Sequence, residues 1–182
     1  MDQGTVIVIV IFGGIFIWVF SKVFSKIKEW IEDEVEDKKR KKFVDKCEKE
    51  LKEFVEGDAE AQATTETNAD NLHSLGCTYD TNKEYKKAAA FFAKAAMQEH
   101  MGAQFCLGSL FSEGKGVIQD FEKSRYWYNK AAMQGHSTAQ YNLGVLYYNG
   151  EGGSRNVSMA KYYFEKAAKQ GNTAAQQTLD RL

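Results

Sequence analysis

Two copies of one pattern decide the fold: AQFCLGSLFSEGKGVIQDFEKSRYWYNKAAMQG at 103–135 and AQYNLGVLYYNGEGGSRNVSMAKYYFEKAAKQG at 139–171. Aligned without a gap at an offset of 36 residues, residues 103–138 and 139–174 share 13 identical positions. A repeat of this length indicates supersecondary units that stack on one another. The repetition therefore predicts the architecture of this part of the chain.

The second copy shows what one repeat unit contains. Apolar side chains at helical spacing predict a first helix over residues 138–149, which the glycines of 150–153 end. A second helix is expected over about 157–170. Gly171 follows it at the position where a left-handed cap residue is preferred. The unit is thus an antiparallel helical hairpin, and stacking the next hairpin on it buries its apolar face.

Two glycines of this unit are expected to have different roles. Gly144 lies inside the first helix, where Gly is disfavoured by about 1 kcal/mol relative to Ala, so we expect close packing of a neighbouring helix there. Gly152 lies in the loop and is assigned to turn geometry. A bulky residue at Gly144 should therefore destabilise the stack more than Gly152→Ala, unless the loop requires a positive φ.

The repeats carry a family resemblance. Both copies contain Leu-Gly in the first helix, a Gly-x-Gly loop and Lys-Ala-Ala-x-Gln-Gly at the end of the second helix. With these motifs, about residues 71–182 resemble Sel1-like repeats, which are relatives of the tetratricopeptide repeat (TPR). Ser124 stands where that family has a small Ala, and Val157 and Ser158 replace an aromatic and an acidic residue. The resemblance implies an all-α fold, an α-solenoid whose first helices line a concave groove that binds proteins.

The whole chain is expected to contain eight segments. They are a short tail, a transmembrane helix, a charged amphipathic juxtamembrane helix, a linker or degenerate capping repeat, a TPR-like repeat, two Sel1-like repeats and a capping helix. In that order their ranges are 1–4, 5–20, 21–56, 57–70, 71–101, 102–137, 138–173 and 174–182.

The segment TVIVIVIFGGIFIWVF at 5–20 carries no charge. Its 16 residues would span about 24 Å as a helix, somewhat short of a hydrocarbon core of about 30 Å. A membrane anchor is predicted, and a cleaved signal peptide or a β-hairpin at Gly13-Gly14 are the alternatives. Basic residues follow the segment and none precedes it. The positive-inside rule then predicts a single-pass protein with its N-terminus outside and its repeats in the cytoplasm.

The region between this segment and the repeats is highly charged. Residues 21–56 hold 11 basic and 11 acidic side chains, with apolar residues at helical spacing between them. KKRKK at 38–42 is interpreted either as a contact for lipid headgroups or as a solvated helix face. Residues 57–70 are polar and acidic, and they form either a linker or part of a degenerate repeat.

No chemistry is visible in the sequence. The cysteines, Cys47, Cys77 and Cys106, match no metal or disulfide spacing, and they indicate reduced thiols in a reducing compartment. The histidines at 73, 100 and 136 are expected at the surface or at helix joints. A catalytic thiol at Cys77 or Cys106 would lack a neighbouring base that the sequence can name. We therefore expect no enzyme activity, no cofactor and no metal site.

The predicted function is that of a membrane-anchored adaptor or scaffold, which binds a protein or peptide in the groove of its repeats. No nucleic acid and no small-molecule substrate are expected as partners. The positions that match groove-facing sites are His73, Cys77, Phe105, Ser109, Tyr141, Asn142, Val145 and Tyr148. Residues 71–182 hold thirteen Lys and Arg and nine Asp and Glu, a balance that favours an apolar ligand with some acidic character.

Two other functions stay open at this point. One is an envelope-associated hydrolase, an activity that has been assigned to some secreted relatives of the family. It would need export and a polar catalytic cluster. The other is a structural subunit whose N-terminal helix assembles a membrane complex.

Overall fold

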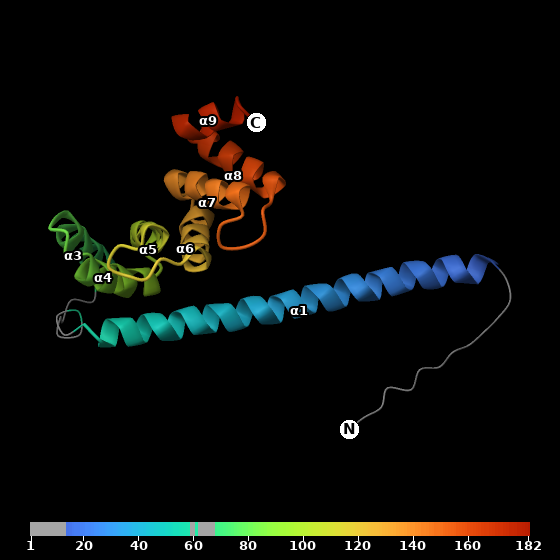
Figure 1. Cartoon of the computed structure of the whole chain (residues 1–182), viewed down its shortest axis with the longest axis horizontal. Coiled ribbons are helices and arrows are strands. Elements are labelled where there is room, and N and C mark those ends of the chain that lie inside the picture. Colours follow the sequence, from blue (N-terminus) through green and yellow to red (C-terminus); the bar gives the residue numbers. More distant parts are fainter. Residues whose placement is uncertain (1–13, 59–60, 62–67) are drawn as a thin grey trace, which may run out of the picture. The chain divides into compact units, whose positions relative to one another are not determined.

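The computed structural model describes residues 14–58, 61 and 68–182, and all regular structure in these ranges is helical (Figure 1). The chain divides into two compact units, 1–48 and 49–182. The helices of the described ranges are α1 (Gly14–Glu56), α3 (Ala69–Thr81), α4 (Tyr85–Met97), α5 (Met101–Glu113), α6 (Phe121–Met133), α7 (Ser137–Asn149), α8 (Val157–Lys169) and α9 (Thr173–Leu179).

The helix α1 is 43 residues long and spans the boundary between the two units. Its side chains at 35–42 are all exposed. Two ion pairs lie on this stretch: Lys39 Nζ is 3.0 Å from Glu36 Oε1, and Arg40 Nη1 is 3.4 Å from Asp37 Oδ1. Such exposed pairs within one helix contribute about 0.3–0.5 kcal/mol each. This stretch is therefore a solvated helix supported by local pairs.

The predicted single-pass membrane topology, with the N-terminus outside and the repeats in the cytoplasm, is wrong. No helix within the described ranges is both long enough and apolar enough to cross a bilayer. Helix α1 begins at Gly14, and its uncharged start ends before Lys22. The apolar residues 14–20 rise by only roughly 10 Å, about a third of the hydrocarbon thickness. Residues 5–13 of the expected span lie outside the described residues.

Residues 69–182 form a stack of helical hairpins, and this confirms the predicted α-solenoid. Helix α3 pairs with α4, α5 with α6, and α7 with α8. Each hairpin packs on the next one through α4 and α5, then α6 and α7, and α9 packs on α8. Figure 1 shows these helices following one another from green to red. Here α3, α5, α7 and α9 are called first helices, and α4, α6 and α8 second helices.

The repeated Ala-Gln and Gln-Gly motifs form hydrogen bonds within hairpins and between them. The amide Nε2 of Gln140 donates to the Ala132 carbonyl at 3.0 Å, and its Oε1 accepts from Gln170 Nε2 at 2.7 Å. One repeat earlier, Gln104 Oε1 accepts from Gln134 Nε2 at 2.8 Å. Both first-helix glutamines are buried, so these bonds satisfy polar groups that would otherwise be costly. The motifs are therefore structural.

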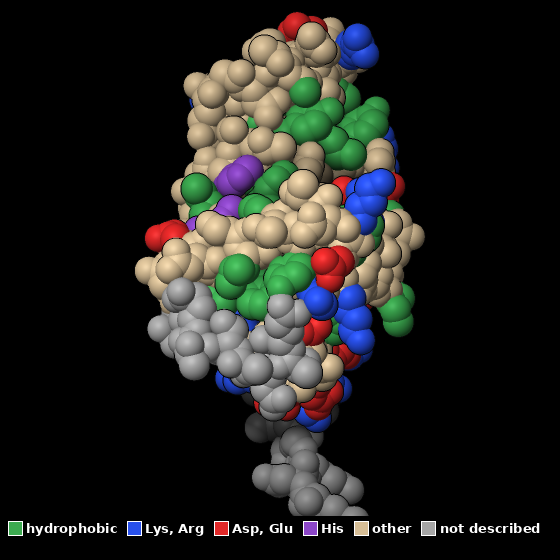
Figure 2. Space-filling model, turned by 90° about the vertical axis from the view of Figure 1, so that its left-hand side faces the viewer, with side chains coloured by type: hydrophobic (Ala, Val, Ile, Leu, Met, Phe, Trp, Pro, Cys, Tyr) green, Lys and Arg blue, Asp and Glu red, His purple; other side chains and the backbone are tan. Residues whose placement is uncertain are grey.

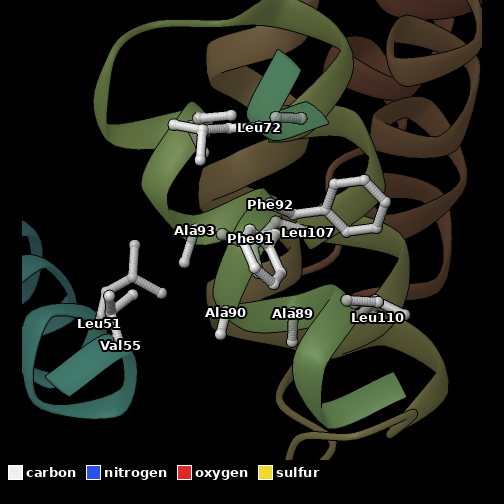
Figure 3. Close-up of a cluster of buried hydrophobic side chains, with 14 of the residues drawn as sticks. Leu51, Val55, Leu72, Ala89, Ala90, Phe91, Phe92, Ala93, Leu107 and Leu110 are labelled. Carbon is white, nitrogen blue, oxygen red and sulfur yellow. The ribbon is translucent and has the colours of Figure 1, made fainter. Parts of the chain in front are cut away.

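The largest buried cluster lies around the alanine-rich α4 (Figure 3). Leu51 and Val55, from the end of α1, belong to this cluster together with Phe91. Ala61 is fully buried, and its carbonyl accepts a hydrogen bond from Lys94 Nζ at 2.8 Å. Residues 59–60 and 62–67 lie outside the described residues, so both interpretations of 57–70 stay predictions.

The expected close packing at Gly144 is confirmed. A Cβ atom at Gly144 would lie 2.6 Å from the ring of Phe164, which comes from the second helix of the same hairpin. The same contact recurs in the other hairpins, between Gly108 and Tyr128 and between Gly76 and Phe92. Real Cβ atoms do not approach so closely, and this explains the glycine inside α3, α5 and α7.

The loop glycines do more than turn the chain. Gly152 has φ of 71°, and a Cβ atom there would clash with the backbone carbonyl of Phe121 at the start of α6. Gly116 has φ of 70° and meets the backbone of Tyr85, at the start of α4, in the same way. Each Gly-x-Gly loop therefore packs against the second helix of the preceding hairpin. The exception allowed for Gly152 therefore applies, because the loop has a positive φ at this position.

Candidate interaction surface

All eight residues predicted for the groove lie on first helices. His73 and Cys77 are on α3, Phe105 and Ser109 on α5, and the other four on α7. The side chains of Cys77 and Tyr148 are exposed, and those of the other six are half-buried. We call this set the first-helix face: His73, Cys77, Phe105, Ser109, Tyr141, Asn142, Val145 and Tyr148.

The first group on this face joins α3 to α5. His73 Nε2 lies 3.6 Å from Cys77 Sγ and 3.9 Å from Cys106 Sγ. The His73 ring stacks on His100, with the ring centroids 4.5 Å apart. His100 Nε2 is 3.1 Å from a carboxylate oxygen of Asp70. No base beside the thiols was expected from the sequence, although His73 and Cys77 are four residues apart in one helix and this spacing places them together.

The electrostatics of this group do not activate a nucleophile. Burial raises the pKa of Cys106 to about 12, and burial followed by the charge of Asp80 raises the pKa of Cys77. Burial also lowers the pKa of His73, with a further contribution from His100. Both thiols are therefore protonated and the imidazole is neutral at neutral pH, whereas thiol chemistry requires a thiolate. The described ranges also hold no group of three or more His, Cys, Asp or Glu side chains arranged for a metal ion.

The second group joins α5 to α7. The Phe105 ring stacks on His136 at 4.5 Å and tilts against Tyr128 at 5.8 Å. Burial raises the pKa of Tyr128, and interactions of its hydroxyl with the side chains of Ser109 and Asn142 lower it by less. Tyr128 comes from the second helix α6, so sequence spacing along the first helices could not reveal that it links these two residues.

The last group lies on α7, and its two tyrosines differ in how much of the side chain is exposed to solvent. Tyr141 tilts against Phe164 at 5.7 Å and packs, like Val145, on the last buried cluster. Tyr148 is 37% exposed. The Arg155 guanidinium lies 5.0 Å from its ring centroid, and Arg155 Nε donates to the Tyr148 carbonyl at 2.8 Å. Tyr148 is thus held in place yet accessible, while Tyr141 also stabilises the stack.

Two histidines outside the predicted set are structural. His100 and His136 are the N-cap residues of α5 and α7, and each Nδ1 accepts the backbone N–H of a residue three positions later, at 3.0 Å and 3.2 Å. Burial lowers the pKa of His136, and this keeps its imidazole neutral and able to accept. The expectation that these histidines lie at helix joints is confirmed.

Charge is distributed unequally between the two kinds of helix. The four first helices contain no Lys or Arg, and their acidic residues are Asp70, Asp80 and Glu113. The second helices hold nine Lys and Arg: residues 86, 87, 94, 123, 125, 130, 161, 166 and 169. In Figure 2 the histidines lie at the left, and most visible Lys and Arg lie at the right and the bottom. The net positive charge therefore gives no reason to expect an acidic ligand on the first-helix face.

Comparison with known families identifies the repeats. A family model described as the Sel1 repeat matches residues 73–100, 102–136 and 137–172, which is more than half of the chain. The chain belongs to the Sel1 repeat family. A fold of this family is typically a non-enzymatic scaffold for protein interactions. A comparison with curated proteins found no match.

Solved structures of other Sel1 repeat proteins are similar to this chain. A protective antigen of uropathogenic Escherichia coli that displays an SLR fold is 33% identical, with a TM-score of 0.57 over 59% of this chain and 24% of the antigen. A Sel1 repeat protein from Oxalobacter formigenes is 34% identical, with a TM-score of 0.57 over 59% of this chain and 44% of that one. The Sel1 repeat chain described here thus matches less than half of either protein.

A more distant neighbour shares the fold alone. Cysteine rich protein B of Helicobacter pylori is 22% identical and has a TM-score of 0.50, over 64% of this chain and 98% of that chain. The similarity supports the Sel1 repeat architecture and carries nothing about partners.

Proposed function

We propose that this Sel1 repeat protein is an adaptor that binds a protein partner through a peptide segment lying along the first-helix face. The observation that supports the proposal is the contrast in charge between the two kinds of helix. Three successive first helices present aromatic and small polar side chains without a single Lys or Arg. These three helices contribute no cation that a ligand would have to desolvate, although Arg155 lies over Tyr148 at the edge of the face. Charged groups are the most costly to desolvate.

The side chains of the face are suited to bind a peptide. Tyr148 offers an exposed ring, and aromatic rings remove a large apolar area from water with little loss of side-chain entropy. The half-buried Ser109 and Asn142 supply hydroxyl and amide groups for the backbone of a bound segment. Their contacts with Tyr128 hold them in place before binding, and this lowers the entropy lost on association.

The proposal is tested by locating where peptides bind. Short random peptides displayed on phage are selected against the full chain. A photo-crosslinking phenylalanine analogue then replaces either Tyr148 on α7 or Tyr162 on α8, which are exposed by 37% and 46%. We expect selected peptides to crosslink from position 148 and not from position 162. No enrichment of peptides, or crosslinking mainly from position 162, would contradict the proposal.

A further inference from the structure

The first-helix face has an acidic end at α3. Asp70, His73, Cys77 and Asp80 follow one another at intervals of three or four residues, so they lie along one stripe of the helix. The charge of Asp80 acts on both Cys77 and Cys106 and raises the pKa of each thiol. Asp80 is exposed and follows Cys77 by three residues in α3. Its carboxylate therefore lies beside the Cys77 thiol, at the edge of the face.

The two carboxylates of this end differ in their partners. Asp70 lies 3.1 Å from His100. Asp80 has no ion pair with another residue of the described ranges. Its charge does reach Lys115, but Lys115 forms its ion pair with Glu113. Asp80 is thus a fixed negative charge that no side chain of the described ranges neutralises, beside half-buried and uncharged groups.

The opposite end of the face has a cation. Arg155 lies over the ring of Tyr148, with the guanidinium 5.0 Å from the ring centroid. The face therefore has a carboxylate at its α3 end and a guanidinium over Tyr148 near the end of α7. Electrostatic complementarity contributes strongly to register and to the choice of partner.

We propose that the partner segment carries a Lys or Arg next to an apolar run, and that this cation binds Asp80 while the apolar run packs across α5 toward Tyr148. The inference rests on the proposed function and adds the chemical class and the direction of the ligand. An ammonium or guanidinium group at Asp80 forms a charge-assisted hydrogen bond at the border of a surface that the peptide desolvates. A second cation at the other end of the segment would meet Arg155, so the basic residue belongs at the α3 end only.

The test uses the peptides that the full chain selects and whose binding requires Tyr148. These peptides should be enriched in Lys and Arg relative to the unselected library. The affinity of one such peptide, and of its version with Gln in place of Lys or Arg, is then measured for the unchanged chain and for Asp80→Asn. Glu165→Gln, at an exposed carboxylate of the second helix α8, is the matched control.

The expected result is a coupling between Asp80 and the peptide cation. Asp80→Asn should weaken the basic peptide about three- to tenfold and leave the Gln peptide unchanged, and Glu165→Gln should affect neither. Circular dichroism checks that each variant keeps its helices. Tyr148-dependent peptides without Lys or Arg, or an equal effect of Asp80→Asn on both peptides, would overturn this inference and leave the proposed function standing. Recovery of no peptide that depends on Tyr148 would overturn both.

Discussion

First and second helices come from the same repeat, yet they use their aromatic residues in opposite ways. In the second helices, Trp127 and Phe164 are buried, with 2% and 1% of their surface exposed. In the first helices, Phe105 and Tyr141 are half-buried and Tyr148 is exposed. These residues show that the second helices supply the largest core side chains, while three aromatic residues of the first helices keep part of their surface in contact with solvent. Phe111 of α5, buried, and Tyr162 of α8, exposed, depart from this pattern.

Cations of the second helices lie over aromatic rings of both kinds of helix. The Arg125 guanidinium lies 3.7 Å from the centroid of Tyr147, and Lys166 Nζ lies 4.8 Å from the centroid of Tyr162. Lys130 Nζ lies over both Tyr126 and Trp127. Long basic side chains cover apolar surface with their stems and keep their charges in water. A ligand on that side would have to displace these contacts.

The joint between the two kinds of helix should show the largest effect. Gly152→Ala should lower the free energy of unfolding by about 3 kcal/mol, because it combines a left-handed backbone with a clash against the Phe121 carbonyl. Gly171→Ala is the matched control, since φ there is 84° and an added Cβ atom would meet no other atom within 4 Å. It should cost only about 1–2 kcal/mol. Urea unfolding of the full chain, followed by circular dichroism, measures both. Equal losses would show that the loop does not pack on α6.

The helix crossing inside a hairpin should show a smaller effect. Gly144→Ala gains helix propensity but places a Cβ atom 2.6 Å from the Phe164 ring. Because a ring can shift more readily than a backbone, the net loss of stability should be about 1–2 kcal/mol. The same urea titration tests this. A gain in stability would mean that the first and second helices are not in close contact at this position.

A buried hydroxyl on a second helix offers a change in the opposite direction. Ser124 is fully buried, and within the described ranges its Oγ has no hydrogen-bond partner. Ser124→Ala should stabilise the chain by about 1 kcal/mol, because an unsatisfied polar group leaves the core. Thermal unfolding of the two proteins makes the comparison. A loss of stability would indicate that the hydroxyl has a partner after folding.

The smallest effect concerns pH and a first-helix cap. Burial lowers the pKa of His136 from its ordinary value of 6.5, so the folded chain takes up a proton less readily than the unfolded chain. Stability should therefore fall as the pH drops through 6.5, and continue to fall down to the lowered pKa of the folded state. His136→Asn should reduce this dependence, since Asn172 already caps α9 through the same bond. The pKa of His73 is also lowered, so some dependence should remain. The free energy of unfolding is measured by urea titration at several pH values between 7.5 and 5.5. The same change of stability with pH in both chains would contradict the account.

Most of the stack could be predicted from the sequence, because the repeated residues are required by local features such as helix ends and helix contacts. Gly144 lies at a close helix contact and Gly171 has a positive φ, and the positions of both glycines in the repeat indicated these roles. The absence of Lys and Arg from the first helices could also have been seen in the sequence, from the expected helix ranges. It does not support the acidic ligand that the net charge of residues 71–182 suggested. The predicted membrane topology is wrong, because no helix of the described ranges is both long enough and apolar enough to cross a bilayer.

Contacts between distant residues could not be read from the sequence. The link that Tyr128 makes between Ser109 and Asn142 depends on how three helices cross. The proximity of Cys106 to His73 likewise depends on the stacking of α3 and α5, whereas the spacing of His73 and Cys77 within one helix was a visible signal. The use of the eight residues as a binding groove stays a prediction.

The most direct test of the first-helix face compares two tyrosines of similar exposure. Tyr148 and Tyr162 each have a cation near the ring, at 5.0 Å and 4.8 Å, but they lie on a first and a second helix. Calorimetry with a selected peptide should show that Tyr148→Ala weakens binding by about 1–3 kcal/mol and that Tyr162→Ala leaves it nearly unchanged. A loss for Tyr162→Ala together with unchanged binding for Tyr148→Ala would place the ligand on the second helices and contradict the account.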